Sequence, residues 1–265
     1  MMRVSVDAVG VLAPGLPDWE ALRAVLSSQC RFVSSPLEAP QPNCLAPAER
    51  RRSSPTVRLA IAVAEQTFRQ TALAPQDMAM VFSSYEAAGV ITHQLCEMLA
   101  GSREVSPTQF HNSVHNAPSG YYSIAMNAQR AASSICRGEW SFAAGLLNAA
   151  AQAVADQLPV LYVCYDSPLP SPMCEVMPVV DAMAIALVLT PHAGPASLAT
   201  WELAIAPRRG AATWHEWIPS EWHANACARG FALLESLANP ACTVVSLPLS
   251  PEIDLAVTRC QFAKN

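Results

Sequence analysis

Residues 136–140, which we call the elbow, combine a thiol, a tight turn and a carboxylate. Gly138 supplies a permissive backbone for a sharp turn between a strand-like run at 133–136 and an Ala- and Leu-rich helix. Glu139 follows that turn, so we expect it at the helix N-terminus, where free N–H groups and the macrodipole favour negative charge. Enzymes often place a nucleophile on such a turn. A carboxylate accepts protons but is a poor nucleophile toward a thioester, so Glu139 either marks a silenced site or only stabilises its helix by about 0.3–1 kcal/mol.

Cys136 is the competing nucleophile, three residues before Glu139. It falls inside the strand-like run, where we expect apolar burial to raise its thiol pKa and suppress its reactivity. His111 and His115 are the available bases for such a thiol. The sequence therefore favours Glu139 over Cys136 as the residue that defines the site.

A dense polar cluster precedes the elbow in an otherwise apolar chain: His111, Asn112, His115 and Asn116. These side chains either shape a loop through hydrogen bonds to the backbone or line a ligand channel. Two histidines four residues apart can bind a metal on one helix face. The intervening Asn-Ser-Val and the nearby Pro118 instead favour loop or extended chain, so we expect no metal there.

The cysteines and the loop motifs predict neither a metal nor a cofactor. The nine cysteines are scattered without any CxxC, and their odd number and wide spacing favour reduced thiols packed as small hydrophobes. We therefore expect neither a disulfide framework nor a zinc site. No Gly-rich phosphate loop, GxSxG motif or dinucleotide fingerprint is present, so no cofactor is expected.

The composition is unusually apolar, with 52% hydrophobic and 14% charged residues. Such a surplus favours a buried interface and hence an obligate oligomer. Trp201, Trp214, Trp217 and Trp222 gather in the C-terminal third, as core or as an interface anchor. A net charge of −5 without a basic stripe argues against nucleic acid and anionic membrane as partners. The opening apolar run contains Asp7 and no run of about 18 uncharged apolar residues follows, so we expect a cytoplasmic protein without a membrane span.

Strand-like and helix-like segments alternate along the chain, which predicts a layered α/β fold with helices covering a central sheet. Strands are expected at 3–11, 78–83, 133–136, 159–165, 179–190, 199–206, 241–247 and 252–259, and helices at 18–26, 54–71, 87–100, 142–157 and 223–238, with a further helical stretch ending near 128. Residues 31–54 read as a long irregular excursion that ends in Glu49-Arg50-Arg51-Arg52. Those arginines are either a solvated turn or a contact for an acidic partner.

The stretch from Pro107 to Leu146 resembles the thiolase-like β-ketoacyl synthases of fatty acid and polyketide assembly. In that family an Asn-containing segment and a Gly just ahead of an inner helix precede a strand and the catalytic cysteine elbow. Residues 113–116 and 120–124 are similar to the first part, and 133–142 to the second. The resemblance puts Glu139 at the position of the nucleophilic cysteine. Other similar stretches are 58–62, 80–84 and 181–190.

This resemblance implies a thiolase-like layered fold, with helices around a central mixed sheet and a buried central helix. Residues 1–191 would form the N-terminal half and 192–265 a shortened C-terminal half packed on the same core. Active synthases take two histidines from the second half, whereas His215 and His223 lie outside any His-Gly-Thr motif. A missing cysteine and a reduced second half are similar to the chain-length factors, above all the small form of aryl polyene (xanthomonadin-type) clusters. A typical chain-length factor carries Gln at the elbow, so Glu139 departs from that pattern.

The resemblance implies a noncatalytic chain-length-factor-like subunit that forms a heterodimer with an active ketosynthase. The two would pair across the edge strand near 133–137 and shape the acyl tunnel, while the partner brings the cysteine and histidines and an acyl carrier protein delivers the chains. Candidates for the acyl channel or the partner interface are His111, His115, Asn116, Gly120, Tyr121, Cys136 and Phe142. Two alternatives stay open: a free-standing acyl-thioester enzyme, for condensation or decarboxylation, that uses Glu139 or Cys136, and a homodimeric scaffold without acyl ligands.

Overall fold

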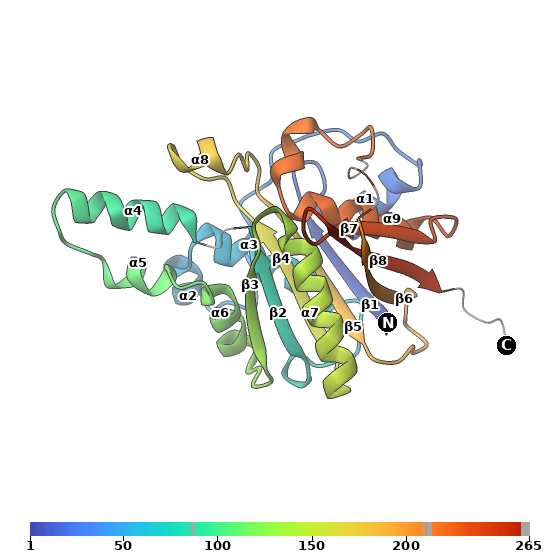
Figure 1. The fold of residues 1–265 in the computed structure, drawn as a ribbon. Coiled ribbons are helices and arrows are strands. Elements are labelled where there is room, and N and C mark those ends of the chain that lie inside the picture. The colour runs from blue at the N-terminus through green and yellow to red at the C-terminus, as the bar shows by residue number, and fades with distance from the viewer. Residues whose placement is uncertain (86–87, 209, 211–213, 261–265) are drawn as a thin grey trace.

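A single mixed sheet organises the chain, in the strand order β3-β2-β4-β5-β1-β6-β8-β7 (Figure 1). The computed structural model describes residues 1–85, 88–208, 210 and 214–260. The strands are β1 (Met2–Leu12), β2 (Ala79–Ser84), β3 (Ala132–Cys136), β4 (Val160–Asp166), β5 (Met183–Thr190), β6 (Ala199–Pro207), β7 (Val244–Pro248) and β8 (Ile253–Cys260). The predicted layered α/β fold is confirmed.

The type of strand pairing changes once across the sheet, from parallel to antiparallel. β2 is parallel to both β3 and β4, and every other pairing is antiparallel. β2, β4 and β5 are buried at every position, as expected of strands covered on both faces. β3 lies at the end of the strand order, so one of its backbone edges has no strand beside it among the described residues.

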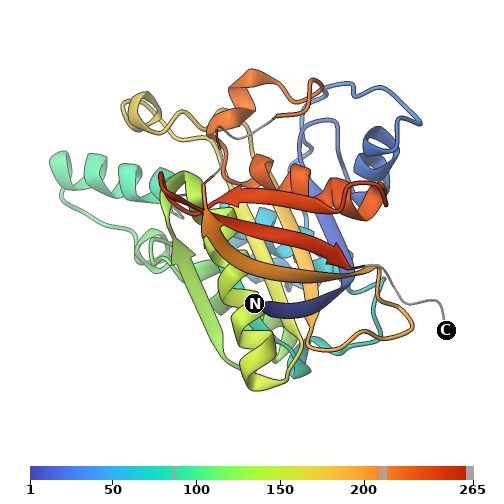
Figure 2. The same ribbon diagram turned by 45° about the vertical axis from the view of Figure 1, so that its right-hand side comes forward.

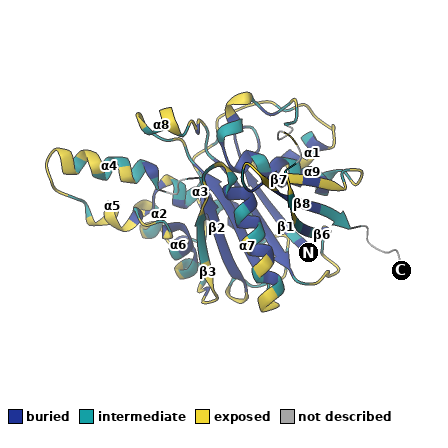
Figure 3. Cartoon of the chain, viewed as in Figure 1, coloured by how far each residue is buried: buried dark blue, intermediate teal, exposed yellow. Residues whose placement is uncertain are grey.

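Helices cover both faces of this sheet (Figures 1 and 3). α3 and α6 pack on one face, and α7 packs across β2, β4, β1 and β5 on the other, where α1 and α9 extend the core. The α-helices are α1 (Trp19–Leu26), α2 (Pro47–Arg52), α3 (Pro55–Thr67), α4 (Gly89–Ala100), α5 (Pro107–Asn112), α6 (Ala117–Met126), α7 (Ser141–Asp156), α8 (Met173–Val176) and α9 (Gly230–Ala238). Short 3-10 helices are η1 (Pro75–Asp77), η2 (Gly138–Trp140), η3 (Ser220–Ala224) and η4 (Cys227–Arg229).

Helices α4 and α5 pack against each other and project away from the sheet, and we call residues 89–112 the arm (Figure 1). The sequence predicts loop or extended chain between His111 and His115; this is wrong for His111 and Asn112, which lie in α5, whereas 113–116 form a turn. The Ser106 hydroxyl caps the N-terminus of α5 and Pro107 occupies its first turn, so this short segment is helical. His111 lies in the last turn of α5 and His115 lies in the turn before α6, so the two histidines do not share a helix face.

The segment after residue 191 continues the same sheet. Figure 2 brings forward β6, β8 and β7, in orange to red, which extend the sheet beyond β1. The predicted helix at 223–238 is wrong in its first part, because the backbone of Asn225 is extended. The Asn225 side chain donates to the Asp181 carbonyl and accepts from the Cys227 N–H. Only α9 is regular α-helix there. The division of the chain at residue 191 stays a prediction.

Three other predicted boundaries move. α3 ends at Thr67 rather than 71, and the following Gln70 side chain bonds both backbone groups of Val9 on β1. β5 starts at Met183 rather than 179, since Asp181 before it accepts a hydrogen bond from Trp222. The excursion predicted at 31–54 contains α2, which Pro47 starts. Among the described helices, none has the length and apolarity needed to cross a bilayer.

Candidate functional site

The elbow forms where β3 ends and α7 begins. Gly138 adopts a φ of +58°, in the left-handed region that favours glycine, and Glu139 lies in η2 directly before α7, as predicted. The Ser141 hydroxyl locks this turn: it accepts a hydrogen bond from the Arg137 N–H at 2.8 Å and donates one to the Gly138 carbonyl at 2.7 Å. The turn therefore presents Glu139 at a fixed place in front of the central helix.

Glu139 is held by an arginine that lies 90 residues further along the chain. The Arg229 Nη2 donates to Glu139 Oε2 at 2.5 Å, and the arginine side chain is only 13% exposed against 48% for the glutamate. Burial lowers the pKa of the Arg229 guanidinium, and the Glu139 charge opposes that shift. Arg229 also lies over the Trp214 ring at 5.3 Å, and Trp214 stacks on His223 at 4.1 Å. The carboxylate at the elbow thus neutralises a largely buried cation, which ties it to the C-terminal segment.

Cys136 lies beside this pair and is exposed, so the sequence expectation of a buried thiol is wrong. The reason is topological, because Cys136 is the last residue of an edge strand. Its thiol donates to the Tyr85 carbonyl at 2.8 Å, and the Tyr85 N–H donates to Asp166 Oδ1 at 2.6 Å. Burial raises the pKa of the Tyr85 hydroxyl, and the negative charge of Glu139 adds to the shift. Thiol, phenol and carboxylate therefore share one small region at the elbow.

Phe142 occupies the first turn of α7 and is fully buried behind the elbow. Its ring lies 5.7 Å from that of Tyr162, and its carbonyl accepts the Tyr162 hydroxyl at 2.6 Å. A side chain at Gly230 would approach the Phe142 ring to 2.5 Å. Phe142 thus belongs to the core that supports the elbow.

The other sequence candidates gather at the base of the arm, away from the elbow contacts. His111, Asn116, Gly120 and Tyr121 line a cavity of about 380 Å³, whose other walls are Glu49 and mostly apolar residues of α6, the turn before it and the segment before α2. The His111 ring lies 5.9 Å from that of Tyr121. Burial raises the pKa of the Tyr121 hydroxyl, and Glu49 in the cavity wall adds to it. The structure therefore brings four of the predicted residues together around one largely apolar space.

His115 lines a neighbouring cavity of about 200 Å³, which shares Val114 and Ala117 with the first. Its floor includes Asn112, whose amide donates to the Arg52 and Thr108 carbonyls at 2.9 Å each. This amide fastens the arm to the end of α2. Within the polar cluster at 111–116, Asn112 thus stabilises the structure through its hydrogen bonds, whereas His111 and His115 each line a cavity.

Large apolar side chains stand exposed beside these cavities. Phe110 on α5 is 65% exposed, Ile124 on α6 is 80% exposed, and Val114 between them is exposed as well. Figure 3 shows exposed stretches, in yellow, along α4 and α5. The sequence does not single out Phe110 or Ile124. Together with the unpaired edge of β3, they form an apolar surface of the kind that a partner covers.

Sequence reasoning also misses Arg229 and overestimates cysteine burial. In the sequence, Arg229 stands out only as a single arginine directly before an apolar helical stretch, which does not predict its pairing with Glu139. Of the nine cysteines, only Cys164 and Cys227 are fully buried. Trp201 and Trp222 are core residues, whereas Trp214 and Trp217 are partly buried against the core.

Comparison with known proteins gives one family. The family model described as "Beta-ketoacyl synthase, N-terminal domain" matches residues 25–240, which includes the stretch that carries the predicted resemblance and confirms it. Comparison with curated proteins finds no match.

Several solved structures share the fold. A complex of the ketosynthase ApeO with its chain length factor ApeC from Xenorhabdus doucetiae contains a chain 23% identical to this one, with a TM-score of 0.73, covering 98% of this chain and 100% of that one. The ishigamide ketosynthase/chain length factor matches at 10% identity and a TM-score of 0.72, over 98% and 99% of the two chains. The complex AntDE:AntF, a type II acyl-carrier protein with its ketosynthase, matches at 11% identity and a TM-score of 0.71, over the same shares. These likenesses confirm the thiolase-like fold predicted from the sequence.

Proposed function

Since the chain belongs to the β-ketoacyl synthase N-terminal domain family, we propose that it is a noncatalytic, chain-length-factor-like subunit. It forms a heterodimer with an active ketosynthase and shapes that partner's acyl tunnel. The partner supplies the thiol and the histidines, and an acyl carrier protein delivers the chains. Two further parts of this proposal are an aryl polyene type of pathway, which the sequence resemblance implies, and a cytoplasmic location, which we expect from the opening run with Asp7 and the lack of a long apolar run.

One observation carries the proposal: a carboxylate, held by a largely buried arginine, stands at the turn in front of the central helix. Condensation needs a nucleophile that becomes acylated and then releases the chain. Glu139 cannot form that thioester, and its ion pair with Arg229 keeps it in place. In this proposal the chain keeps the family's fold, with Glu139 at the position where the sequence resemblance puts the family's nucleophilic cysteine.

The partner surface in this proposal consists of the free edge of β3 and the apolar side chains at the base of the arm. An edge strand offers unpaired backbone groups for a strand of a second chain, and the exposed Phe110 and Ile124 supply the apolar contact. The carrier protein would meet α2, where Arg51 and Arg52 are exposed. These arginines suit an acidic partner.

The direct test is coexpression with the ketosynthase encoded in the same gene cluster. We expect a stable 1:1 complex that elongates carrier-bound chains, and no turnover when this chain is assayed alone. Size-exclusion chromatography with light scattering measures the stoichiometry, and mass spectrometry of carrier-bound products measures the activity. A chain that stays monomeric beside every ketosynthase of its cluster contradicts the proposal.

Glu139→Ala tests the role of the elbow carboxylate. The substitution leaves the Arg229 guanidinium largely buried without its counter-ion, so we expect the free energy of unfolding to fall by about 1–3 kcal/mol and the product length of the complex to shift. Chemical denaturation measures the first effect and product profiling the second.

The matched control for Glu139→Ala is Glu20→Ala, which breaks an ion pair of the same N···O distance between two exposed side chains. Exposed pairs contribute little, so the free energy of unfolding should change by no more than about 0.5–1 kcal/mol. Equal stability changes in the two variants, with an unchanged product profile for Glu139→Ala, would remove the proposed role of Glu139.

The exposed thiol of Cys136 favours a second candidate, a free-standing acyl-thioester enzyme. Its Sγ lies at the elbow, within hydrogen-bond distance of the Tyr85 carbonyl. This candidate requires that the lone chain turn over acyl thioesters and that Cys136→Ser abolish the turnover. The same assay of the isolated chain therefore separates the two functions.

A further inference from the structure

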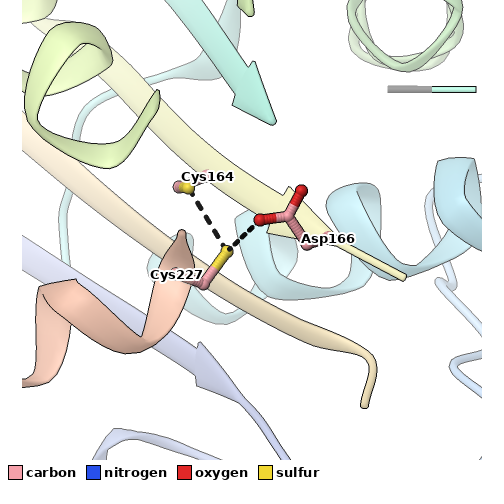
Figure 4. A group of neighbouring side chains, drawn as sticks. All are labelled: Cys164, Asp166 and Cys227. Atoms are coloured by element: carbon pink, nitrogen blue, oxygen red, sulfur yellow. Dashed lines mark hydrogen bonds between the residues drawn. The ribbon is translucent and has the colours of Figure 1, made fainter. Parts of the chain in front are cut away.

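A second group of reactive side chains lies inside the protein, apart from the elbow. Cys164 and Asp166 on β4 and Cys227 on η4 converge, all of them buried, and their ligand atoms lie within 4.8 Å of one another (Figure 4). The Cys227 Sγ is 3.2 Å from the Cys164 Sγ and 3.8 Å from Asp166 Oδ2. Two sulfurs and one carboxylate oxygen therefore point at a common centre.

The local structure explains this convergence. Cys164 and Asp166 are two residues apart on a strand, so their side chains project from the same face of the sheet. η4 packs against β4 and delivers Cys227 to that face. Asn225 fixes η4, since its side chain accepts from the Cys227 N–H at 2.9 Å and donates to the Asp181 carbonyl at 3.0 Å. All three donors are thus held by packed, hydrogen-bonded backbone.

No cationic side chain pairs with this group in the part of the chain that the structure describes. Among the described residues no Lys, Arg or His forms a salt bridge with Asp166, which accepts a hydrogen bond from the Tyr85 N–H. A cavity of about 10 Å³ borders Asp166, Ser84 and Tyr85 but neither cysteine, and its volume is about that of a single water-sized occupant. A cation could reach the carboxylate from this side.

We propose that Cys164, Asp166 and Cys227 bind a zinc ion. Zn²⁺ binds thiolate sulfur at about 2.3 Å and carboxylate oxygen at about 2.0–2.2 Å in tetrahedral geometry. Bonds of these lengths separate two sulfurs by about 3.8 Å and a sulfur and an oxygen by about 3.6 Å. The observed separations of 3.2 and 3.8 Å need only small side-chain adjustments to reach those values. The fourth position is left to water or another small ligand.

Zinc at this place would fasten the C-terminal segment to the first half of the chain. Cys227 is two residues from Arg229, the partner of Glu139, so the ion also fixes the helix that positions the elbow's ion pair. Binding releases the protons of the two thiols, because the thiolates are the ligands. The inference is independent of the proposed function, since it requires neither a ketosynthase partner nor an acyl substrate.

The test is a metal titration of the purified full chain, kept reduced by a phosphine and never exposed to chelators. We expect about one equivalent of zinc by elemental analysis. Replacement by Co²⁺ should give the visible bands of a tetrahedral site and a sulfur-to-cobalt charge-transfer band. Zinc removal should lower the melting temperature, and zinc addition should restore it.

Variants assign the ligands. Cys227→Ala and Asp166→Asn should each weaken Co²⁺ binding by more than tenfold, whereas Cys30→Ala, which removes an exposed cysteine, should leave the spectrum unchanged. The titration of the wild-type chain decides the question even where a core variant fails to fold. Absence of the tetrahedral cobalt spectrum in the wild-type chain overturns the proposal. So does a native Cys164–Cys227 disulfide, seen in the intact mass as a loss of two hydrogen atoms, because its sulfurs are not free to bind.

Discussion

Ile124→Glu should prevent the chain from forming a stable complex with its ketosynthase while its own fold stays intact. Ile124 is 80% exposed and lies on α6, where it lines the cavity at the base of the arm. A glutamate there costs the isolated chain little, since surface substitutions away from special features usually change stability within about 0.5 kcal/mol. Covered by an apolar partner surface, the same carboxylate would be buried without a counter-ion. We expect a loss of at least about 2 kcal/mol of binding free energy, or roughly 30-fold in Kd.

Titration calorimetry against the purified ketosynthase measures this loss, and circular dichroism melting checks the fold of each variant. Phe110→Glu is a second variant on the same surface and should behave alike. The matched control is Val33→Glu, because Val33 is 72% exposed in the loop between α1 and α2. If Val33→Glu weakened the complex as strongly as Ile124→Glu, the base of the arm would not be the interface.

The elbow shows how far a single sequence reaches. Gly138 and the apolar run after it predict a turn and a central helix with Glu139 at its start, and the structure has both. Local backbone rules are enough for that prediction, since a positive φ and a helix terminus involve only neighbouring residues. The partner of Glu139 is Arg229, and nothing local links residues that are 90 positions apart. The location of the elbow is thus predictable, whereas its electrostatics depend on tertiary packing.

The arm shows how one local signal can be masked by another. Ser54-Pro55 predicts the start of α3 correctly, and Ser106-Pro107 starts α5 by the same capping mechanism. The polar residues after Pro107 favour loop when they are read alone. Packing of α5 against α4, together with the hydrogen bonds of Asn112, makes the segment helical.

The cysteines show the limit of spacing rules. Metal motifs are recognised when ligands recur at short fixed intervals, and the sequence holds no such pair. Cys164 and Cys227 lie 63 residues apart and meet only because β4 and η4 pack together. Strand periodicity predicts that Cys164 and Asp166 lie on one face of the sheet. It does not predict that Cys227 is buried beside them, because that depends on tertiary packing.

Gly145→Ala should strongly destabilise the fold, because α7 packs tightly against β2 and β4 at this residue. A Cβ at position 145 would lie 2.5 Å from Tyr162 Cε2 and 2.7 Å from the Ser83 hydroxyl. Tyr162 cannot swing away without cost, since its hydroxyl is bonded to the Phe142 carbonyl at 2.6 Å and to Ser83 at 3.0 Å. Overpacking of a tight core typically costs about 1–3 kcal/mol, and this site should lie at the upper end. The melting temperature should therefore fall by roughly 5–10 °C.

Gly120→Ala is the control that separates helix propensity from packing. Gly120 is also inside a helix, α6, but a Cβ there meets nothing within 4 Å. Alanine is the better helix former, so this variant should gain about 0.5–1 kcal/mol. The paired melting curves should thus move in opposite directions. A Gly145→Ala chain as stable as the wild type would mean that α7 can shift away from the sheet. The elbow at its N-terminus would then not be held rigidly enough to keep Glu139 fixed in front of the central helix.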